Sequence, residues 1–594
     1  MTSLGATATR TMCEAFQATI VRDPDAVAVR TVGDTTTLTF AEWGAQVRAI
    51  AAGLATLGVR RGDTVALLMS NRPEFYPIDV AVQHLGAAPF SIYSTSSPEQ
   101  VAYLLEDSKA RVVVCERQYV QTLVTIGVSA ELVCIDGNPD HTVSLDTVIS
   151  RPDPDFDFEE VWRAVEPDDV LTLIYTSGTT GDPKGVPITH ANMLAMMAGT
   201  ERLWESDSDD RIMSFLPSAH IADRLSALYH LIVAGNQLTT VADRNDLAAA
   251  LIDVQPTIFG AVPQIWQKLK AAVEGRIDEA RGVEKLFINW AITVGRQASD
   301  SELNGVAVSS LLRAQHLVAE ALVLSKLRSA IGLNTPKLAI SAAAPLPEEV
   351  LRFFNGIGVP LSDAWGMSEL SGVVTMSAKG HIRPGTVGQP LDGVEIMIAD
   401  DGEVLVRGPM VMNGYLNKTE QTAATIDTEG WLHTGDIGEL DDDGYLAIVD
   451  RKKELIINAG GKNMSPANIE NWIKAFTPLI AQAVAIGNNR KYNVALIALD
   501  PDAVAATSRH RDLPTDPAEL AGHPRIHAAV TDAVARANSK LSRVEQIKKF
   551  RIVPEFWEAG SDVLTSTLKI RRKQIERRYA DVIEELYSDS RKRE

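Results

Sequence analysis

Residues 175–185 read Tyr-Thr-Ser-Gly-Thr-Thr-Gly-Asp-Pro-Lys-Gly, and this loop directly follows an apolar run at 170–175. A short apolar run that ends in glycine and hydroxyl residues is typical of a buried strand followed by a turn. The backbone N–H groups and hydroxyls of such a turn can converge on phosphate oxygens, and Lys184 adds positive charge. We interpret the loop as a candidate phosphate-binding turn, although a Gly-rich loop taken alone is more often an ordinary solvated turn.

The spacing of this loop excludes one common phosphate-binding motif, the P-loop of nucleoside triphosphatases. That motif needs four residues between its first Gly and a Gly-Lys pair, with Ser or Thr after the Lys. Here only two residues separate Gly178 from Gly181, and Gly185 follows Lys184. We therefore expect a phosphate site of a different kind.

The sequence before the loop alternates helical and extended patterns. Apolar residues at helical spacing predict helices over 41–57 and 78–85, and a compact apolar run predicts a strand over 64–69. Alternation of this kind favours a mainly parallel sheet that is covered by helices on both faces.

The sequence after the loop changes character three times. Residues 265–333 are largely helical in pattern and predict a helical elaboration of the sheet. Residues 391–445 read as short strands with Asp-Gly turns, which predicts a compact antiparallel portion. Beyond the charged run at 450–454, helix and strand patterns alternate over about 140 residues, enough for a second domain with its own core.

We therefore predict an α/β protein in two domains. The large N-terminal domain, over 1–449, contains mixed, mainly parallel sheets covered by helices plus a short β-rich portion. A hinge over 450–453 leads to a smaller α+β C-terminal domain over 454–594.

Composition limits the classes of function. Of the 594 residues 45% are hydrophobic and 23% are charged, as in ordinary globular proteins. The formal net charge of −20 opposes sequence-independent binding of nucleic acid, and we expect no nucleic-acid partner. Three cysteines without a CxxC pair predict neither a disulfide framework nor a zinc site. Because no apolar run of about 18 residues and no secretion signal occurs, we expect a cytoplasmic protein without a transmembrane segment.

The Gly-rich loop is one of six motifs that occur here in the order found in the adenylate-forming superfamily, which contains acyl-CoA synthetases, peptide-synthetase adenylation domains and luciferases. The other five are Phe215-Leu-Pro-Ser-Ala-His220, Asp363-Ala-Trp-Gly-Met-Ser-Glu369, Trp431-Leu-His-Thr-Gly-Asp436, Asp450-Arg-Lys-Lys453 and Leu564-Thr-Ser-Thr-Leu-Lys569. Because the resemblance covers roughly residues 20–590, we identify the chain as a member of this superfamily. The stretches at 93–100 and 259–268 resemble the long-chain acyl-CoA synthetases within it.

The resemblance implies a set of catalytic residues. These are Lys569, Glu369, Lys184 and His220. Glu369 and Thr179 are the implied Mg²⁺ contacts, and a carboxylate is a suitable ligand for that ion. His220 is expected to gate the carboxylate pocket and not to act as a base, because a fatty carboxylate is already ionised near neutral pH. Taken alone, a Glu or a Lys is usually a solvated surface group.

The resemblance also implies contacts with ATP and coenzyme A. The residues concerned are Thr176, Ser177, Gly178, Thr179, Thr180, Gly181, Lys184, Trp365, Gly366, Ser368, Asp436, Arg451, Lys453, Gly460 and Gly461. Three positions depart from the family pattern. The family usually has Tyr at Trp365 and Arg at Gln264, and a Gly-Gly pair in place of Ala342-Ala343. An indole can still stack on adenine, whereas alanines narrow the allowed backbone conformations.

The function implied by the resemblance is that of a long-chain fatty acid:CoA ligase, with Mg²⁺ as cofactor and ATP and coenzyme A as co-substrates. The C-terminal domain is then mobile and alternates between two half-reactions. The alternatives are a fatty acyl-AMP ligase that delivers to a carrier protein and an inactive acyl- or nucleotide-binding sensor. A homodimer is possible, and the basic residues between 569 and 578 predict at most weak, salt-sensitive contact with a membrane.

Overall fold

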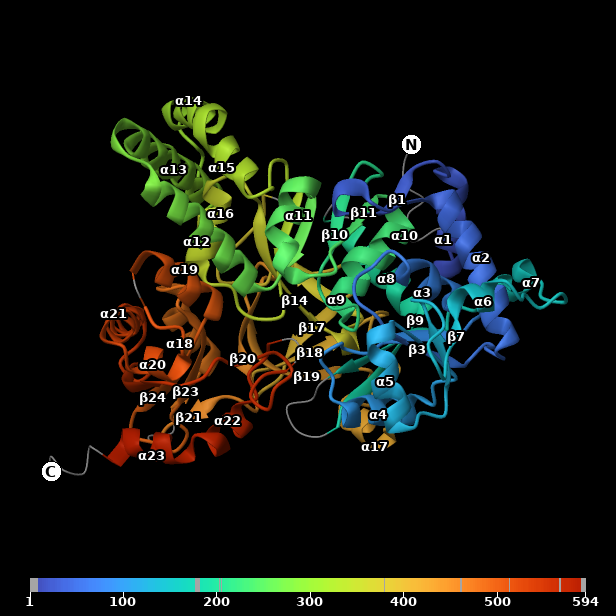
Figure 1. Cartoon of the computed structure of the whole chain (residues 1–594). Coiled ribbons are helices and arrows are strands. Elements are labelled where there is room, and N and C mark those ends of the chain that lie inside the picture. Colours follow the sequence, from blue (N-terminus) through green and yellow to red (C-terminus); the bar gives the residue numbers. More distant parts are fainter. Residues whose placement is uncertain are drawn as a thin grey trace.

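The structure is a computed structural model that describes residues 9–176, 182–201, 203, 206–378, 380–459, 462–511, 513–565 and 568–588. Figure 1 shows the N-terminal elements on the right, a group of helices at the upper left and the C-terminal elements at the lower left. The first two groups form one large body, and the third is a separate domain packed beside it.

One sheet of the large body is entirely parallel and has the strand order β4-β3-β5-β6-β7. Its strands are β3 (Thr64–Leu68), β4 (Ala88–Ser91), β5 (Val112–Cys115), β6 (Glu131–Cys134) and β7 (Val143–Ser144). The helices between these strands and beside them are α2 (Phe40–Thr56), α3 (Phe75–His84), α4 (Pro98–Ser108), α5 (Arg117–Ile126), α6 (Leu145–Ile149) and α7 (Phe158–Arg163). Helix α2 begins at a capping box in which Thr39 and Glu42 satisfy each other's free backbone N–H groups.

Two further sheets of the large body mix parallel and antiparallel strands. The first has the order β10-β11-β1-β2, with β1 (Val27–Thr31), β2 (Thr37–Thr39), β10 (Arg211–Ser214) and β11 (Gln237–Thr240). The second has the order β12-β13-β14-β15-β16, with β12 (Ile258–Ala261), β13 (Leu338–Ser341), β14 (Leu361–Met367), β15 (Gly372–Met376) and β16 (Gln389–Pro390). The surrounding helices are α1 (Met12–Arg22), η2 (Val32–Asp34), α8 (His190–Glu201), α9 (Ile221–Asp223), η3 (Arg224–Tyr229), α10 (His230–Ala234), η4 (Arg244–Asp246), α11 (Leu247–Val254), α16 (Glu348–Gly356) and η6 (Ser368–Leu370).

The predicted strand before the Gly-rich loop is one arm of an antiparallel hairpin, β8 (Val170–Thr176) with β9 (Lys184–Thr189). The Thr172 hydroxyl donates a 2.7 Å hydrogen bond to the Pro89 carbonyl, which ties the hairpin to β4 of the parallel sheet. The β-rich portion is also antiparallel and consists of β17 (Glu395–Ile398), β18 (Glu403–Arg407), β19 (Leu432–Leu440) and β20 (Leu446–Arg451), with α17 (Thr419–Ala423) between the middle strands.

The helical elaboration consists of α12 (Pro263–Glu279), α13 (Gly282–Leu303), α14 (Ser310–Ala319), the π-helical turn η5 (Glu320–Leu324) and α15 (Ser325–Ala330). In Figure 1 α13, α14 and α15 lie at the upper left, and α12 lies below them beside α19. The spacing of Leu286, Trp290 and Val294 correctly indicates a helix, but only Val294 is buried, whereas Leu286 is 71% exposed. Periodicity thus predicts the helix without revealing which of its residues pack.

The C-terminal domain has its own sheet and its own core. Its strands are β21 (Ile456–Ile457), β22 (Asn463–Met464), β23 (Ile480–Ile486), β24 (Asn493–Leu499) and β25 (Ile547–Ile552), and its helices are α18 (Pro466–Ala475), α19 (Pro501–Arg511), α20 (Pro517–Gly522), α21 (Pro524–Lys540), α22 (Arg572–Arg578) and α23 (Ala580–Ser588). Two apolar clusters lie wholly within this domain. The prediction of a separate α+β module is confirmed.

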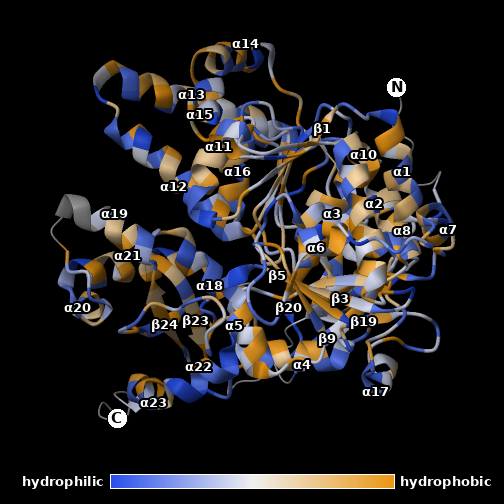
Figure 2. Cartoon of the chain, turned by 45° about the vertical axis from the view of Figure 1, so that its right-hand side comes forward, coloured by the Kyte–Doolittle hydropathy of each residue, from blue (hydrophilic) through white to orange (hydrophobic). Residues whose placement is uncertain are grey.

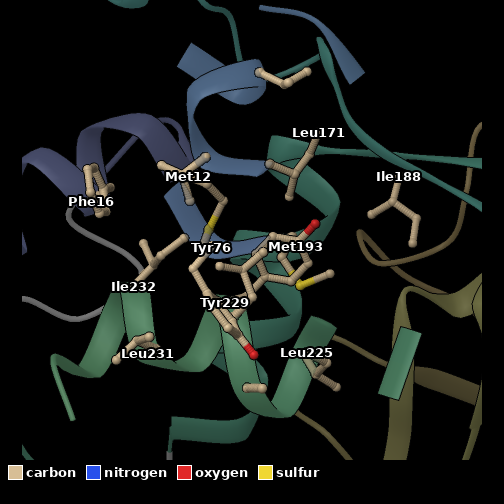
Figure 3. Packing of buried hydrophobic residues seen from close by; sticks show 14 of the residues in the cluster. Met12, Phe16, Tyr76, Leu171, Ile188, Met193, Leu225, Tyr229, Leu231 and Ile232 are labelled. Atoms are coloured by element: carbon tan, nitrogen blue, oxygen red, sulfur yellow. The ribbon is translucent and has the colours of Figure 1, made fainter. Parts of the chain in front are cut away.

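The largest apolar cluster lies in the N-terminal body, where α1, α3, α8 and η3 meet. Figure 3 shows Tyr76, Met193 and Tyr229 close together at this junction with Phe16 to one side, and all four side chains are almost completely buried. The cluster fixes the segment that leads from β10 through α9 into η3, and that segment carries one of the predicted site residues, His220.

Several contacts join the domains. The Lys268 ammonium on α12 lies 3.0 Å from the Asp502 carboxylate on α19 and 3.5 Å from that of Asp500, and the Asn471 amide on α18 donates to the Pro345 carbonyl at 3.3 Å. The connecting segment begins in a strand, because Asp450 and Arg451 are the last two residues of β20. The Asp450 carboxylate also accepts hydrogen bonds from the Ser465 hydroxyl and the Ala467 N–H at the start of α18.

Candidate active site

Three predicted nucleotide contacts meet at Asp436. Its Oδ1 lies 2.7 Å from Arg451 Nε, and its Oδ2 accepts a 2.8 Å hydrogen bond from the indole Nε1 of Trp365. Arg451 is directly opposite Asp436 in the β19–β20 ladder, and Trp365 comes from β14. An antiparallel register therefore brings together two residues that are 15 positions apart in the sequence.

The electrostatic environment of Asp436 is set by burial and by cations. The residue is 3% exposed, and burial raises the pKa of its carboxyl group, while Arg451 and Lys569 act in the opposite direction. Arg451 and the Trp365 indole N–H each use one lone pair of the charged Asp436 carboxylate, and its other lone pairs can accept hydrogen bonds from further donors. The arrangement can hold a pair of hydroxyl groups.

A second cluster joins Glu369, Tyr415 and Lys184. The Tyr415 hydroxyl donates a 2.8 Å hydrogen bond to Glu369 Oε1, and the Lys184 ammonium lies 4.3 Å from the centre of the Tyr415 ring. Burial and the neighbouring Glu369 raise the pKa of Tyr415, so its hydroxyl keeps its proton and acts as a donor. Glu369 lies in the short turn η6, and Lys184 begins β9. Sequence analysis did not select Tyr415, which lies in none of the six motifs.

The backbone between Trp365 and Glu369 is closely packed. A Cβ atom on Gly366 would lie 1.9 Å from the Gly372 carbonyl oxygen, so only glycine fits where β14 passes β15. The next motif hydroxyl, Ser368, is buried. Gly366 therefore has a structural role, because it lets β14 and β15 lie close enough together to position Trp365 and Glu369.

His220 lies at the N-terminus of α9, and a buried arginine holds its loop. The Nδ1 atom of His220 accepts a 3.1 Å hydrogen bond from the Ala222 N–H. Two positions after Ala222, Arg224 donates to the Ser218 carbonyl at 3.1 Å and pairs with Asp79 on α3 at 2.7 Å. Both charged side chains of this pair are completely buried. The pair anchors the loop that carries His220 to the core.

His220 is neutral near pH 7. Burial and the positive charge of Lys569 lower the pKa of its ring to about 4. Because Nδ1 accepts a hydrogen bond, the proton of the neutral ring is on Nε2. This environment agrees with the expectation that His220 does not act as a base, although its role is still a prediction.

Lys569 reaches the site from the C-terminal domain. Its N–H donates to the Thr565 hydroxyl at 3.0 Å, and the Thr565 N–H donates to the Lys569 carbonyl at 2.9 Å. These two bonds close the ends of a tight loop. The Lys569 side chain is exposed along part of its length, but the surrounding protein removes water from its ammonium group. This desolvation and the positive charge of Arg451 lower the pKa of Lys569, whereas Asp436 and Glu369 act in the opposite direction. Lys569 therefore interacts electrostatically with the Asp436, Glu369 and His220 clusters.

Asp363 is a further polar group beside the site that sequence analysis did not select. Its Oδ2 accepts a 3.2 Å hydrogen bond from the Leu346 N–H, while its Oδ1 is buried without a hydrogen-bond partner in the described part of the chain. Burial raises the pKa of Asp363 to about 7. A buried oxygen without a partner is rare, and it can accept a hydrogen bond from a ligand.

The adjacent turn contains the departure Ala342-Ala343. Ala343 has a φ of +73°, in the left-handed region where glycine is unstrained and alanine is not. The family's glycine would relieve this strain, so the departure has a conformational cost here.

Two more of the predicted contacts lie in the described part of the chain. Thr176 is the last residue of β8 and pairs with Lys184 in the β8–β9 ladder, whereas the side chain of Lys453 is exposed to solvent. The residues Ser177, Gly178, Thr179, Thr180, Gly181, Gly460 and Gly461 lie outside the described part of the chain. Their contacts, and Thr179 as a metal ligand, are still predictions.

The residues present fit an Mg²⁺ ion that arrives with a nucleotide. Among the described residues no group of three or more His, Cys, Asp or Glu side chains could hold a metal ion by itself. Mg²⁺ at phosphate sites commonly takes one or two carboxylates, and the phosphates and water supply the other ligands. Glu369, oriented by the Tyr415 hydroxyl, supplies one such carboxylate.

Comparison with known proteins gives consistent matches. The family model described as AMP-binding enzyme matches residues 16–416, and that of the AMP-binding enzyme C-terminal domain matches residues 453–591. The putative fatty-acid–CoA ligase fadD11 of Mycobacterium tuberculosis is 50% identical over 449 residues, which cover 75% of this chain and 79% of the relative. The long-chain-fatty-acid–CoA ligase FadD15 of the same species is 35% identical over 580 residues, 95% of each chain.

Solved structures agree on the fold. O-succinylbenzoate coenzyme A synthetase from Bacillus subtilis, in complex with ATP and magnesium ion, superposes with a TM-score of 0.67 at 22% identity. The superposition covers 95% of this chain and 99% of that one. Both the large body and the C-terminal domain are included in this likeness.

Proposed function

The chain belongs to the AMP-binding enzyme family, an adenylate-forming superfamily that binds ATP, and we propose that it is an AMP-forming long-chain fatty acid:CoA ligase. The observation that carries this proposal is the convergence of charged groups from both domains. Asp436 with Arg451, and Glu369 with Lys184 and Tyr415, all belong to the large body, and Lys569 comes from the other domain. An inactive sensor has no need of this convergence.

In the proposed first half-reaction a fatty carboxylate oxygen attacks the α-phosphorus of ATP. A bond forms between these atoms, the bond to the bridging oxygen breaks, and pyrophosphate leaves with the electron pair. The products are acyl-AMP and pyrophosphate. The ammonium of Lys569 would neutralise the developing charge, and Lys184 would hold the phosphates. Such a transfer needs positioning and charge stabilisation more than covalent chemistry from the protein.

The other residues of the site have supporting roles in this proposal. Asp436 would accept hydrogen bonds from the ribose hydroxyls, with Trp365 and Arg451 fixing its orientation. Mg²⁺, when bound with ATP, supplies further charge neutralisation on the phosphates, and Glu369 would hold it. His220, neutral and anchored through Arg224, would line the carboxylate pocket.

In the proposed second half-reaction the thiolate of coenzyme A attacks the acyl carbon and AMP leaves. We propose that the domain over 454–594 first rotates about residues 450–453, which removes Lys569 and brings Gly460 and Gly461 towards the thiol path. Lys268 is half-exposed and lies 3.0 Å from Asp502 and 3.5 Å from Asp500, so solvent screens these contacts and they oppose such a rotation only weakly.

Two choices within the proposal rest on relatives. The names of fadD11 and FadD15 support a fatty acid as substrate and coenzyme A as acceptor, and the name of FadD15 supports a long chain. A cytoplasmic location is also part of the proposal. It is supported by Cys13, Cys115 and Cys134, which are all free and buried.

Product analysis tests the proposal. The full chain is incubated with ATP, Mg²⁺ and a panel of fatty acids of different length, with and without coenzyme A, and products are identified by mass spectrometry. We expect acyl-AMP without coenzyme A and long-chain acyl-CoA with it. ATP–pyrophosphate exchange should require the acid and Mg²⁺ but not coenzyme A.

The outcomes separate the candidates. Acyl-AMP that coenzyme A never consumes would indicate a ligase that delivers to a carrier protein. No product from any acid, in a chain that still binds ATP, would indicate a sensor. Glu369→Gln provides the matched control, since it retains the hydrogen bond from Tyr415 but removes the charge that would hold Mg²⁺.

A further inference from the structure

The exposed apolar side chains of this protein are concentrated in one segment. Fifteen large apolar side chains are exposed in the described part of the chain, and eight of them lie between residues 283 and 322. They are Val283, Leu286, Phe287, Val306, Leu311, Leu317, Val318 and Leu322. Single exposed apolar residues are ordinary, whereas a concentration of this kind marks an interaction surface.

The continuous helix formed by α14 and η5 is apolar on both faces. Its inner face packs into the core through Leu312, Ala319, Val323 and Leu324. Its outer face, defined here as Leu311, Ala314, Leu317, Val318, Ala321 and Leu322, is exposed throughout, with Leu311 at 71% and Leu317 at 66%. Polar residues, Arg313, Gln315, His316 and Glu320, also lie on this helix, but an apolar helix face is normally covered by another element. Nothing in the described part of the chain covers the outer face.

The charge along α14 and η5 differs from that of the whole protein. Between residues 303 and 347 the only acidic residue is Glu320, which pairs with Arg328, whereas Asp300 and Glu302 lie at the end of the neighbouring helix α13. Four cationic side chains occur in the same stretch. Two of them, Arg313 and Lys326, are exposed next to the outer face and have no carboxylate within ion-pair distance in the part of the chain that the structure describes. The outer face is apolar, and the exposed cations Arg313 and Lys326 lie beside it.

The outer face also lies where a large flat partner can reach it. In Figures 1 and 2 α14 forms the upper extremity of the molecule, and Figure 2 shows hydrophobic segments of α13 and α14 there. The basic helix α22 lies at the opposite, lower side in both views. The two helices thus lie at opposite ends of the molecule in these views.

We propose that the outer face of α14 and η5 docks onto the surface of a bilayer that contains anionic phospholipid. The leucines would enter the boundary between headgroups and acyl chains, and Arg313 and Lys326 would lie among the phosphates. This is contact in the plane of the interface, because no helix in the described ranges is both long and apolar enough to cross a bilayer. The inference goes beyond the proposed function and does not depend on it.

A second copy of the chain fits the surface less well. Pairing of two outer faces would bring the unpaired cations Arg313 and Lys326 of one copy near those of the other. An anionic lipid surface satisfies both the apolar residues and the cations.

The experiment is vesicle flotation with the full chain and no ATP, acid or coenzyme A, so its result is independent of catalysis. Vesicles contain equal parts of phosphatidylglycerol and phosphatidylcholine, or phosphatidylcholine alone. We expect flotation with the anionic vesicles. Raising the salt from about 0.1 M to about 1 M should weaken it only a few-fold, because the Debye length falls but apolar burial is not screened.

Variants assign the binding to residues. Leu311→Ser/Leu317→Ser/Leu322→Ser should reduce the partition coefficient about tenfold or more, because three side chains lose their gain from leaving water. The control Val21→Ser/Ile252→Ser, with both substitutions at exposed apolar residues elsewhere, should bind as the parent does. Arg313→Gln/Lys326→Gln should remove the preference for anionic vesicles.

A label gives a second measurement if the triple variant folds poorly. The native cysteines are buried, so Leu317→Cys can be modified selectively with a polarity-sensitive fluorophore. Its emission should shift to the blue when vesicles are added, whereas the same label at Val21→Cys should not respond.

Three results would overturn the proposal. The triple variant could bind like the parent, or binding could disappear only when the α22 charges are removed by Lys573→Gln/Arg577→Gln. Light scattering could instead show a dimer of the parent that the triple variant abolishes, which would assign the face to a second copy.

Discussion

The indole Nε1 of Trp365 donates a 2.8 Å hydrogen bond to Oδ2 of the buried Asp436. Trp365 stands where the superfamily usually has tyrosine, and the larger ring reaches across from β14 to β19. The departure therefore gives Asp436 a neutral donor on one oxygen while Arg451 holds the other.

Trp365→Phe removes this donor while keeping an aromatic face. Because a hydrogen bond to a charged group contributes about 1.5–3 kcal/mol, we expect the KM for ATP to rise about tenfold or more, with a smaller change in kcat. Steady-state kinetics with saturating acid measures this. Trp472→Phe, on α18 of the other domain, is the control, and an unchanged KM for ATP in Trp365→Phe would show that the bond does not orient Asp436.

Tyr415→Phe keeps the ring beside Lys184 but removes the hydroxyl that orients Glu369. Loss of a group that orients a metal ligand commonly costs about 10–100-fold in metal affinity. We therefore expect a higher Mg²⁺ concentration for half-maximal ATP–pyrophosphate exchange, measured by titration at fixed ATP. Tyr415→Leu removes the ring as well, and it should further weaken ATP binding. Equal Mg²⁺ dependence in parent and Tyr415→Phe would contradict a metal role for Glu369.

Lys569→Ala separates the two half-reactions. It should slow adenylation about 10²- to 10³-fold, the typical effect of losing one preorganised donor, while conversion of supplied acyl-AMP and coenzyme A stays nearly normal. Lys573→Ala, an exposed lysine four residues further on, is the matched control and should leave both rates unchanged. Equal losses in both half-reactions of Lys569→Ala would remove the case for domain alternation.

Asp363→Asn tests the raised pKa of Asp363. The folded protein holds this proton up to about pH 7, whereas the unfolded chain releases it near the ordinary value of 3.8. A raised folded pKa means that the group stabilises the fold at low pH and that this contribution is lost as pH rises from about 4 to about 7. We expect thermal unfolding to show Asp363→Asn gaining stability relative to the parent over this range. The control Asp209→Asn, at an exposed position, should show no such trend. The absence of a trend in Asp363→Asn would mean that the Asp363 carboxyl is ionised throughout this pH range.

Local pattern predicted much of the fold because the relevant interactions are close in sequence. The helix expected over 41–57 is α2 (Phe40–Thr56), and the strand expected over 64–69 is β3 (Thr64–Leu68). Exposure was less predictable, as Leu286 shows, because it depends on whether another element arrives to cover a helix face.

The candidate site was predicted only where a motif contained the residue. Asp436, Arg451 and Trp365 lie in motifs, and the structure brings them together. Tyr415 and the buried pair of Arg224 with Asp79 could not be found in this way, because their partners are 46 and 145 positions away in the sequence. No local spacing encodes such contacts, and only the packing of separate sheets and helices creates them.

The hydrogen bonds from the start of α18 to Asp450 bear on the proposed rotation of the C-terminal domain. Asp450 is fixed in β20 opposite Ile437 of the large body, yet its carboxylate satisfies the Ser465 hydroxyl and the Ala467 N–H of the small domain. The rotation proposed above would leave both donors to water if it separates these groups, and loss of a hydrogen bond costs about 1 kcal/mol. Under that proposal these bonds favour the arrangement with Lys569 at the site, and reorientation would follow the formation of pyrophosphate.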